Sequence, residues 1–243
     1  MPPASAHRSI DPDLVFVPPN LPEDIAAGAV LPIDKPANST SFDIVREVRS
    51  LADLKKVGHA GTLDPLATGL LIVLVARPAT RLQDAFMYLR KTYTGTMRLG
   101  ETTPSHDSET AVTESVDTSH LSEAEIRDAL EAFVGEIEQV PPMYSAVKIG
   151  GEKLYKKARR GEQVERPPRP VTIYDACITD IRGSEVDFKI DCSKGTYVRS
   201  LARDVGAELG VGAHLTALRR TAIGDYRVED AWSLDQLRDA FGM

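Results

Sequence analysis

A glycine-containing loop, GHAGTLDPLATG at residues 58–69, is the sharpest chemical feature of the sequence. Its three glycines permit a ligand to approach the backbone closely. Asp64 stands directly before a proline, and His59 is the only other charged or titratable residue of the loop. A carboxylate beside the apolar Leu63 and Leu66 therefore needs a remote cation to stay ionised. An Asp-Pro pair alone is an ordinary turn, and the full twelve-residue string is far more specific than the pair.

Residue types elsewhere argue against metal or redox chemistry. The five histidines are scattered without ligand spacing, and neither Cys177 nor Cys192 has a CxxC partner. We expect both cysteines to be buried apolar residues on strands, and the protein to work in a reducing compartment. We expect no metal and no other cofactor. The N-terminus does not resemble a signal peptide, and no apolar run reaches the roughly 18 residues that span a bilayer. We expect a soluble, cytoplasmic protein without membrane contact, and a monomer.

Charge is unevenly placed along a chain whose net charge is −7. Residues 101–138 hold eleven acidic residues against the single Arg127, whereas residues 146–170 hold eight Lys or Arg against three Glu. The basic stretch suits a nucleic-acid backbone, and a solvated basic loop without any partner is the alternative.

The elements that must position the loop mix hairpins with helices. Apolar runs and period-two alternation predict strands at 29–33, 70–75, 92–99, 171–181 and 186–192, the last two pairing as a hairpin. Helical spacing and caps predict helices from Thr40 or Ser41, near 80–88, from Ser122, from Val198 to Gly210 and from Ser233. This order predicts an α+β fold around a mixed, largely antiparallel sheet flanked by helices.

The ends of this fold and a long interruption set the expected domains. Six of the sixteen prolines fall in the first 22 residues, so we expect residues 1–28 to be a proline-rich, disordered arm. Residues 29–243 would form one catalytic domain. Periodicity is lost from Gly135 to Arg169, which predicts a basic insertion at about 135–169.

Several motifs in order make the chain resemble the TruB family of tRNA pseudouridine synthases, over nearly all of Leu31 to Trp232. They are the loop at 58–69, Asp34-Lys35-Pro36, Lys91-Thr92-Tyr93, Met143-Tyr144-Ser145-Ala146, residues 192–199 (CSKGTYVR), Gly212-Ala213-His214 and Leu218-Arg219-Arg220. The resemblance implies a pseudouridine synthase fold and an isomerase that converts uridine-55 in the T loop of tRNA to pseudouridine. The chain resembles the form of the family that lacks a C-terminal PUA domain, and we expect that domain to be absent.

The resemblance also implies roles at the reacting centre. Asp64 would be the essential carboxylate, and whether it attacks C1′ or abstracts a sugar proton stays open. Arg199 would pair with Asp64 and orient it. Tyr93 would stack on the uracil and take part in the final proton removal.

Further residues would hold the flipped nucleotide. Tyr197 and Leu218 would line the pocket, and His59 would fill the space that the nucleotide vacates. Lys35 would support the base of the loop. Each of these residues, taken alone, is more often part of a core or a surface.

The basic insertion would close over the RNA like a thumb, with Lys156, Lys157 and Arg159 on phosphates. Two other classes of protein compete with this interpretation. A non-catalytic RNA-binding module would keep the pocket without the reaction, and a carboxylate-pair hydrolase would need a second acid such as Asp107 near Asp64. The partner that the resemblance implies is the T-arm stem-loop of tRNA.

Overall fold

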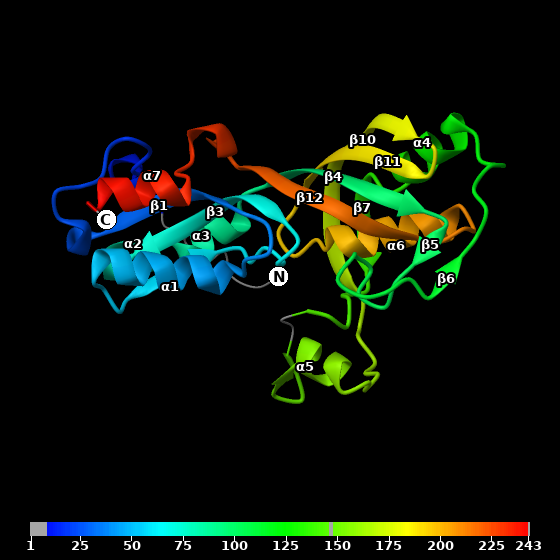
Figure 1. Cartoon of the computed structure of the whole chain (residues 1–243), viewed down its shortest axis with the longest axis horizontal. Coiled ribbons are helices and arrows are strands. Elements are labelled where there is room, and N and C mark those ends of the chain that lie inside the picture. Colours follow the sequence, from blue (N-terminus) through cyan, green and yellow to red (C-terminus); the bar gives the residue numbers. More distant parts are fainter. Residues whose placement is uncertain (1–8, 146–147, 243) are drawn as a thin grey trace. The chain divides into compact units, whose positions relative to one another are not determined.

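The computed structural model describes residues 9–145 and 148–242. Contacts between Cα atoms divide the chain into two compact units, Met1–Tyr93 with Arg219–Met243 and Thr94–Leu218. Two long strands, β4 (Lys91–Leu99) and β12 (Ala213–Ile223), contribute residues to both units (Figure 1). The catalytic domain expected over residues 29–243 thus contains two compact units.

The first unit is built on a mixed sheet around β3 (Thr68–Val75). This strand pairs antiparallel with β1 (Ala29–Lys35) and β2 (Val57–Ala60), and parallel with β12 at Arg219 and Arg220. The remaining elements of the unit are α1 (Ser41–Ala52), α2 (Ala76–Thr80), α3 (Gln83–Tyr88), β13 (Tyr226–Arg227), α7 (Leu234–Ala240) and the 3-10 turns η1 (Pro12–Leu14), η2 (Ile25–Ala27) and η3 (Val228–Asp230).

Both faces of β3 are buried, as its unbroken apolar run predicted. Its alternate residues fall into two core clusters, Leu71, Val73 and Val75 in one and Leu70, Ile72 and Leu74 in the other. Burial of each such side chain contributes about 1.5–3 kcal/mol. The strand that follows the glycine loop is therefore firmly anchored.

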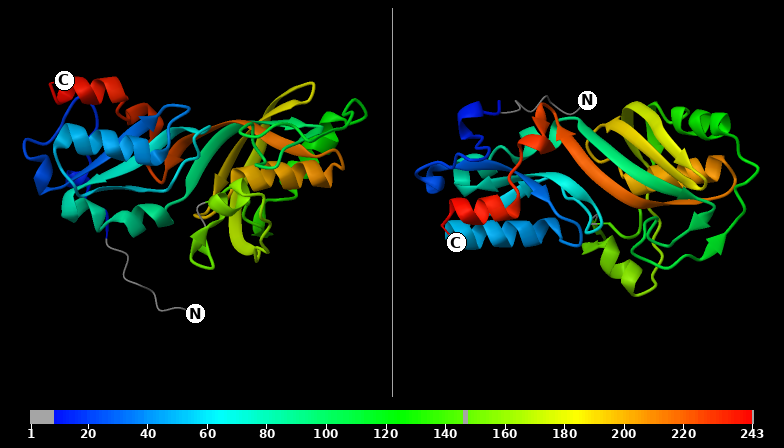
Figure 2. Two further views of the ribbon diagram at one scale, coloured as in Figure 1. Left: turned by 60° about the horizontal axis from the view of Figure 1, so that its bottom comes forward. Right: turned by 45° about the horizontal axis from the view of Figure 1, so that its top comes forward.

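Helix α1 begins where the sequence predicted a cap. Thr40 is the N-cap residue, and its side chain and that of Asp43 form a reciprocal capping box. Helix α7 comes last in the chain and lies beside α1 (Figure 2). Arg238 Nη2 of α7 lies 2.6 Å from Glu47 Oε1 of α1. Ile44, Val45 and Val48 of α1 share a buried core cluster with residues of β1 and β3, which holds the helix against the sheet.

Residues 9–28 differ from the disordered arm expected for residues 1–28. Phe16 and Ile25 pack against the core cluster of the first unit, and Trp232 Nε1 donates a hydrogen bond to the Phe16 carbonyl oxygen at 2.8 Å. The scattered apolar residues of this segment show no period, but a tertiary partner buries them. Residues 1–8 lie outside the described residues.

The second unit holds strands in the order β12, β4, β11, β10 and β7. The predicted hairpin is confirmed: β10 (Arg169–Arg182) and β11 (Glu185–Cys192) pair antiparallel up to Arg182 and Glu185. Cys192 is buried as expected, but the expectation is wrong for Cys177, which is exposed because it lies on the same side of the hairpin as its exposed partner Lys189. Strand β7 (Gly135–Gln139) adds to the other edge of β10. Helix α4 (Glu123–Glu131), with the predicted capping box at Ser122, packs on β10 and contacts α6 (Val198–Glu208). Strands β5 (Glu101–Thr102) and β6 (Glu114–Ser115) form a small separate ribbon.

The basic insertion projects from the rest of the second unit (Figure 1). It contains β8 (Lys148–Ile149), β9 (Glu152–Lys153) and α5 (Leu154–Arg159). Strand β7 pairs with β10 within the sheet, beginning at Arg169. The projecting part is therefore shorter than the range 135–169, which was expected from the loss of periodicity there. Sheet pairing, which the local pattern does not show, accounts for the difference.

The expected fold class is confirmed: helices flank a mixed sheet in which most neighbouring strands run antiparallel. Among the described residues, none of the helices combines the length and the apolar character needed to cross a membrane.

Candidate active site

The loop that carries Asp64 connects β2 to β3 and is fixed from α1. Ser41, the first residue of α1, accepts a hydrogen bond from the Leu63 N–H at 2.8 Å and donates one to the Leu63 carbonyl oxygen at 3.0 Å. Leu63 is buried, and the next residue, Asp64, is half-buried. The Ala67 N–H donates to the Asp64 carbonyl oxygen at 3.1 Å and closes the turn. The backbone on both sides of the carboxylate is therefore held in place.

Lys35 lies beneath this loop, with a side chain that is 0% exposed. Its ammonium group donates to the carbonyl oxygens of Pro36 at 2.8 Å, Ser39 at 2.7 Å and Pro65 at 3.4 Å. Burial lowers the pKa of Lys35 to about 8, while the Asp64 carboxylate acts in the opposite direction. Lys35 is thus a cation within electrostatic reach of Asp64 and a tie between β1 and the loop.

A second buried cation, Arg220, joins the loop to Tyr93. Its guanidinium donates to the Gly61 carbonyl oxygen at 2.9 Å and to the Leu70 carbonyl oxygen at 2.7 Å. It also donates to the Tyr93 hydroxyl at 3.4 Å and lies 6.0 Å from the centre of that ring. Gly61 has a φ of +88°, a conformation that glycine adopts readily, and a Cβ there would lie 3.3 Å from the guanidinium. The glycine therefore permits this close approach.

His59, on β2, is the remaining predicted residue of the first unit. Its Nδ1 is buried and has no hydrogen-bond partner among the described residues. Burial, assisted by the charge of Arg220, lowers the pKa of His59. Its ring is therefore neutral at pH 7.

In the second unit Arg199, on α6, is 3% exposed and held by three groups. Its Nε lies 3.4 Å from Asp107 Oδ2, and its Nη atoms donate to the carbonyl oxygens of Ser105 at 2.9 Å and Tyr144 at 2.8 Å. Asp107 is itself 1% exposed and accepts a hydrogen bond from the Glu109 N–H at 2.9 Å. The expected pairing of Arg199 with Asp64 stays a prediction.

Tyr197 and Leu218 also belong to the second unit. Tyr197 is half-buried at the N-cap of α6, two residues before Arg199. Leu218 is buried on β12, and a Cβ at Gly95 of β4 would lie 3.3 Å from its Cδ1 and 2.8 Å from the Ala217 carbonyl oxygen. Only glycine at position 95 allows β4 to approach β12 this closely.

The insertion carries the three predicted RNA-binding residues. The side chains of Lys156 and Arg159 lie outside the described residues, whereas Lys157 is half-buried on α5. Arg160 forms hydrogen bonds at 2.7–2.8 Å with Glu152 and Glu162. The positive charge of the insertion is therefore partly neutralised from within.

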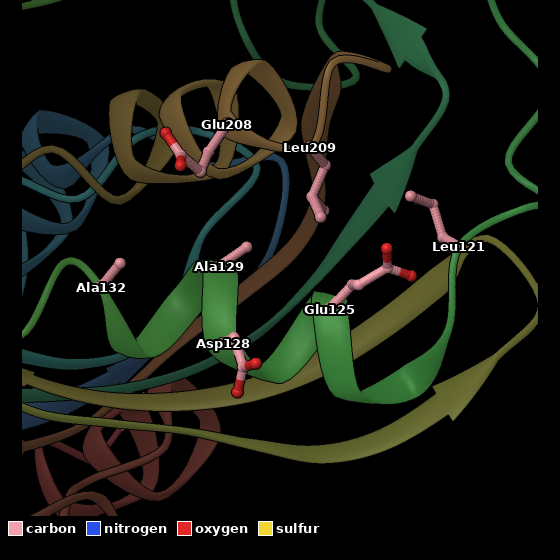
Figure 3. A pocket seen from close by; sticks show the side chains of 7 residues that line it. All are labelled: Leu121, Glu125, Asp128, Ala129, Ala132, Glu208 and Leu209. Carbon is pink, nitrogen blue, oxygen red and sulfur yellow. The ribbon is translucent and has the colours of Figure 1, made fainter.

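A hollow of about 350 Å³ lies between α4 and the end of α6 (Figure 3). Three carboxylates, those of Glu125, Asp128 and Glu208, line it, together with Leu121, Ala129, Ala132 and Leu209. Its negative charge would repel RNA phosphates, and it contains no predicted site residue. It is not the candidate active site.

The structure thus groups the predicted residues by unit. Lys35, His59, Asp64 and Tyr93 lie in the first unit, and Tyr197, Arg199 and Leu218 lie in the second. Sequence reasoning assigned no role to Arg220, although the residue stands in one of the motifs, and it considered Asp107 only as a second acid. The signal that could have pointed to Arg220 is its place in the Leu218-Arg219-Arg220 motif, because β12 also carries Arg219 and two threonines and shows no clear strand pattern.

Profiles of two protein-family domains match the chain. The TruB family pseudouridylate synthase N-terminal domain matches residues 49–198, and the tRNA pseudouridylate synthase B C-terminal domain matches residues 199–243. A tRNA pseudouridine synthase B from Thermobifida fusca is 48% identical over 223 residues, which cover 88% of this chain and 76% of that protein. Its namesake from Flavobacterium johnsoniae is 46% identical, over 86% of this chain and 94% of that protein.

Among solved structures, a chain of a Cbf5-Nop10-Gar1 complex superposes with a TM-score of 0.69 at 32% identity. The alignment covers 95% of this chain and 60% of that chain. The present chain therefore spans about 60% of the length of that solved relative.

Proposed function

Since this chain belongs to the TruB family of pseudouridylate synthases, we propose that it isomerises uridine-55 in the T loop of tRNA to pseudouridine. The observation that carries the proposal is the placement of the Asp64 loop. Ser41 joins the loop to α1 by two hydrogen bonds, and the buried cations Lys35 and Arg220 donate to its carbonyl oxygens. The reaction breaks the bond from C1′ to N1, turns the uracil and forms a bond from C1′ to C5; C5 then loses its proton and N1 gains one, so the product is an isomer of uridine. It requires one correctly placed carboxylate.

Asp64 is that carboxylate, acting on the sugar or the base. Positive charge favours the ionised form of a nearby carboxylate, and the charges of Lys35 and Asp64 influence one another. Arg199 orients Asp64 when the substrate is bound. The ion pair between Arg199 and Asp107 holds the Arg199 guanidinium in a buried position.

The nucleotide must leave the stacked loop, at a cost of about a few kcal/mol. Tyr93 stacks on the flipped uracil, with its hydroxyl held by Arg220. Tyr197 and Leu218 line the other walls of the pocket. His59 occupies the vacated space, and because its ring is neutral at pH 7, stacking among bases does not require a charge to be desolvated.

Binding of the tRNA uses the insertion as well. Lys156, Lys157 and Arg159 contact phosphates of the T arm, where flexible basic side chains suit a backbone of irregular shape. We also propose that the protein acts as a monomer in the cytoplasm.

The test is to compare Asp64→Asn with the unchanged protein on tRNA. Asparagine keeps the shape of the side chain and removes its charge, so pseudouridine formation should fall below detection while the Kd for tRNA changes by less than about tenfold. Asp84→Asn, an exposed change on α3 of the same unit, is the matched control and should keep full activity.

Two results would contradict the proposal. Activity of Asp64→Asn close to that of the unchanged protein would remove Asp64 from the mechanism. An unchanged protein that binds tRNA but forms no pseudouridine would support the non-catalytic RNA-binding module instead.

A further inference from the structure

Gln139, the last residue of β7, is a buried polar residue without an assigned role, and only 2% of it is exposed. Its side-chain amide makes two hydrogen bonds to one residue 58 positions away. The Tyr197 N–H donates to Gln139 Oε1 at 2.7 Å, and Gln139 Nε2 donates to the Tyr197 carbonyl oxygen at 3.1 Å. One side chain thus satisfies both backbone polar groups of Tyr197.

Tyr197 stands where α6 begins, so this clamp acts on the start of the helix. The first N–H groups of a helix have no partner within it, and tyrosine lacks the short side-chain oxygen of a good N-cap residue. From another strand, Gln139 accepts a hydrogen bond from the N–H of this N-cap residue, as the N3 side chain of a capping box does from within a helix. Fixing the N–H and the carbonyl of Tyr197 fixes the direction in which its side chain leaves the backbone, and it fixes the helix turn that presents Arg199.

The first turn of α6 also makes hydrogen bonds to residues 140–144, which lead into the insertion. Ser200 Oγ donates to the Val140 carbonyl oxygen at 3.0 Å, and Arg199 Nη2 donates to the Tyr144 carbonyl oxygen at 2.8 Å. Together with Gln139, these contacts join residues 139–144 to the first turn of α6. The root of the insertion and the Tyr197–Arg199 segment are therefore one connected structure within the second unit.

We propose that Gln139 is a positioning residue for pseudouridine formation, acting through its two-point clamp on the Tyr197 backbone. The inference rests on the proposed function, in which Tyr197 contacts the reacting nucleotide and Arg199 contacts the Asp64 carboxylate. Gln139 itself contacts neither. Its loss should weaken the alignment of the bound nucleotide more than the binding of the RNA.

The experiment uses Gln139→Met, which keeps the length of the side chain and removes both hydrogen bonds, and Gln139→Glu, which keeps the acceptor for the Tyr197 N–H. For Gln139→Met we expect kcat to fall by about 10- to 100-fold, with KM for tRNA within about threefold. Gln139→Glu should lie between Gln139→Met and the unchanged protein. Hydrogen exchange at the Tyr197 amide should be fast in Gln139→Met and slow in the unchanged protein.

Arg127→Met is the matched control. It also removes a side-chain hydrogen bond to a backbone carbonyl of the second unit, that of Ile178 at 3.0 Å. Its kcat should stay within about twofold of the unchanged protein. An equal loss of kcat in this control would show a general effect of destabilisation and overturn the inference.

Other outcomes separate this inference from the proposed function. Gln139→Met with unchanged kcat, or with a slowly exchanging Tyr197 amide, overturns the inference while the proposed function stands. An unchanged protein that makes no pseudouridine overturns the proposed function, and the inference with it.

Discussion

At the scale of single residues, the buried cations of the first unit are satisfied mainly by backbone oxygens. Lys35 donates to three carbonyl oxygens, and Arg220 donates to two carbonyl oxygens and a phenol. A buried charge is costly unless such donors and acceptors surround it. Both side chains thereby tie the loop at 61–67 to the sheet, and both carry positive charge to the neighbourhood of Asp64.

The stability of the protein should depend on the titration of Lys35. Burial lowers the pKa of its ammonium group from 10.5 to about 8, so between these pH values the unfolded chain binds more protons than the folded chain. The free energy of unfolding should therefore rise with pH from about 8 to about 10.5, by at most about 3 kcal/mol from this group. Urea unfolding of the unchanged protein and of Lys35→Met across this range measures it. Parallel pH profiles of the two proteins would contradict the assignment.

At the scale of elements, the proposed function divides the task of holding RNA between the insertion and α6. Helix α6 supplies Arg199 from a buried position, whereas α5 lies on a segment that projects from the rest of the second unit. Buried groups are suited to orientation, and exposed cations are suited to long-range attraction and phosphate contact. Arg160 is engaged with Glu152 and Glu162, so the free charge of the segment must come from other residues.

Neutral substitution on the insertion should weaken tRNA binding and its salt dependence. Changing Lys156, Lys157 and Arg159 to Gln together should reduce the slope of log K against log salt by up to about 0.9 for each lost phosphate contact. Filter binding or fluorescence titration between low and moderate salt gives the slope. Lys189→Gln, an exposed change on β11, is the control and should leave it unchanged. A slope that the triple variant preserves would show that the insertion does not touch the backbone of the RNA.

At the scale of the whole molecule, the proposed catalytic residues come from both compact units. The first contributes Asp64 and Tyr93, the second Tyr197 and Arg199. The chain passes between the units through β4 and β12, the strands that also carry Tyr93 and Leu218. The proposed reaction therefore requires that both units fold.

The substrate that this set of residues needs is small. In the proposed function every residue that contacts RNA acts on the target nucleotide or on phosphates of the T arm, so an isolated T-arm stem-loop should react with a kcat/KM within about tenfold of that of whole tRNA, or about 1.4 kcal/mol. Free uridine should not react, because it lacks the phosphates and the loop whose binding energy aligns C1′ with Asp64. Pseudouridine formed from the three substrates decides the matter, and an inert stem-loop would show that contacts beyond the T arm are needed.

The sequence by itself determined the features that depend on neighbouring residues. A cap at Thr40 or Ser41 and capping boxes at Ser122 and Ser233 predicted helix starts that the structure confirms, with Thr40 as the N-cap residue of α1, because a cap involves residues only three apart. The apolar run of β3 and the alternating hairpin β10–β11 were equally readable. The motif order also identified the family, which the matched profiles confirm.

Only the tertiary structure decided the features that join distant segments. Strand β2 is short and contains a glycine, and β12 carries the charged Arg219 and Arg220, so neither shows a clear strand pattern. The pair of Arg199 with Asp107 and the clamp of Gln139 on Tyr197 join residues far apart in the chain. Local patterns cannot specify such partners, because the partner of a buried polar group is chosen by how sheets and helices pack.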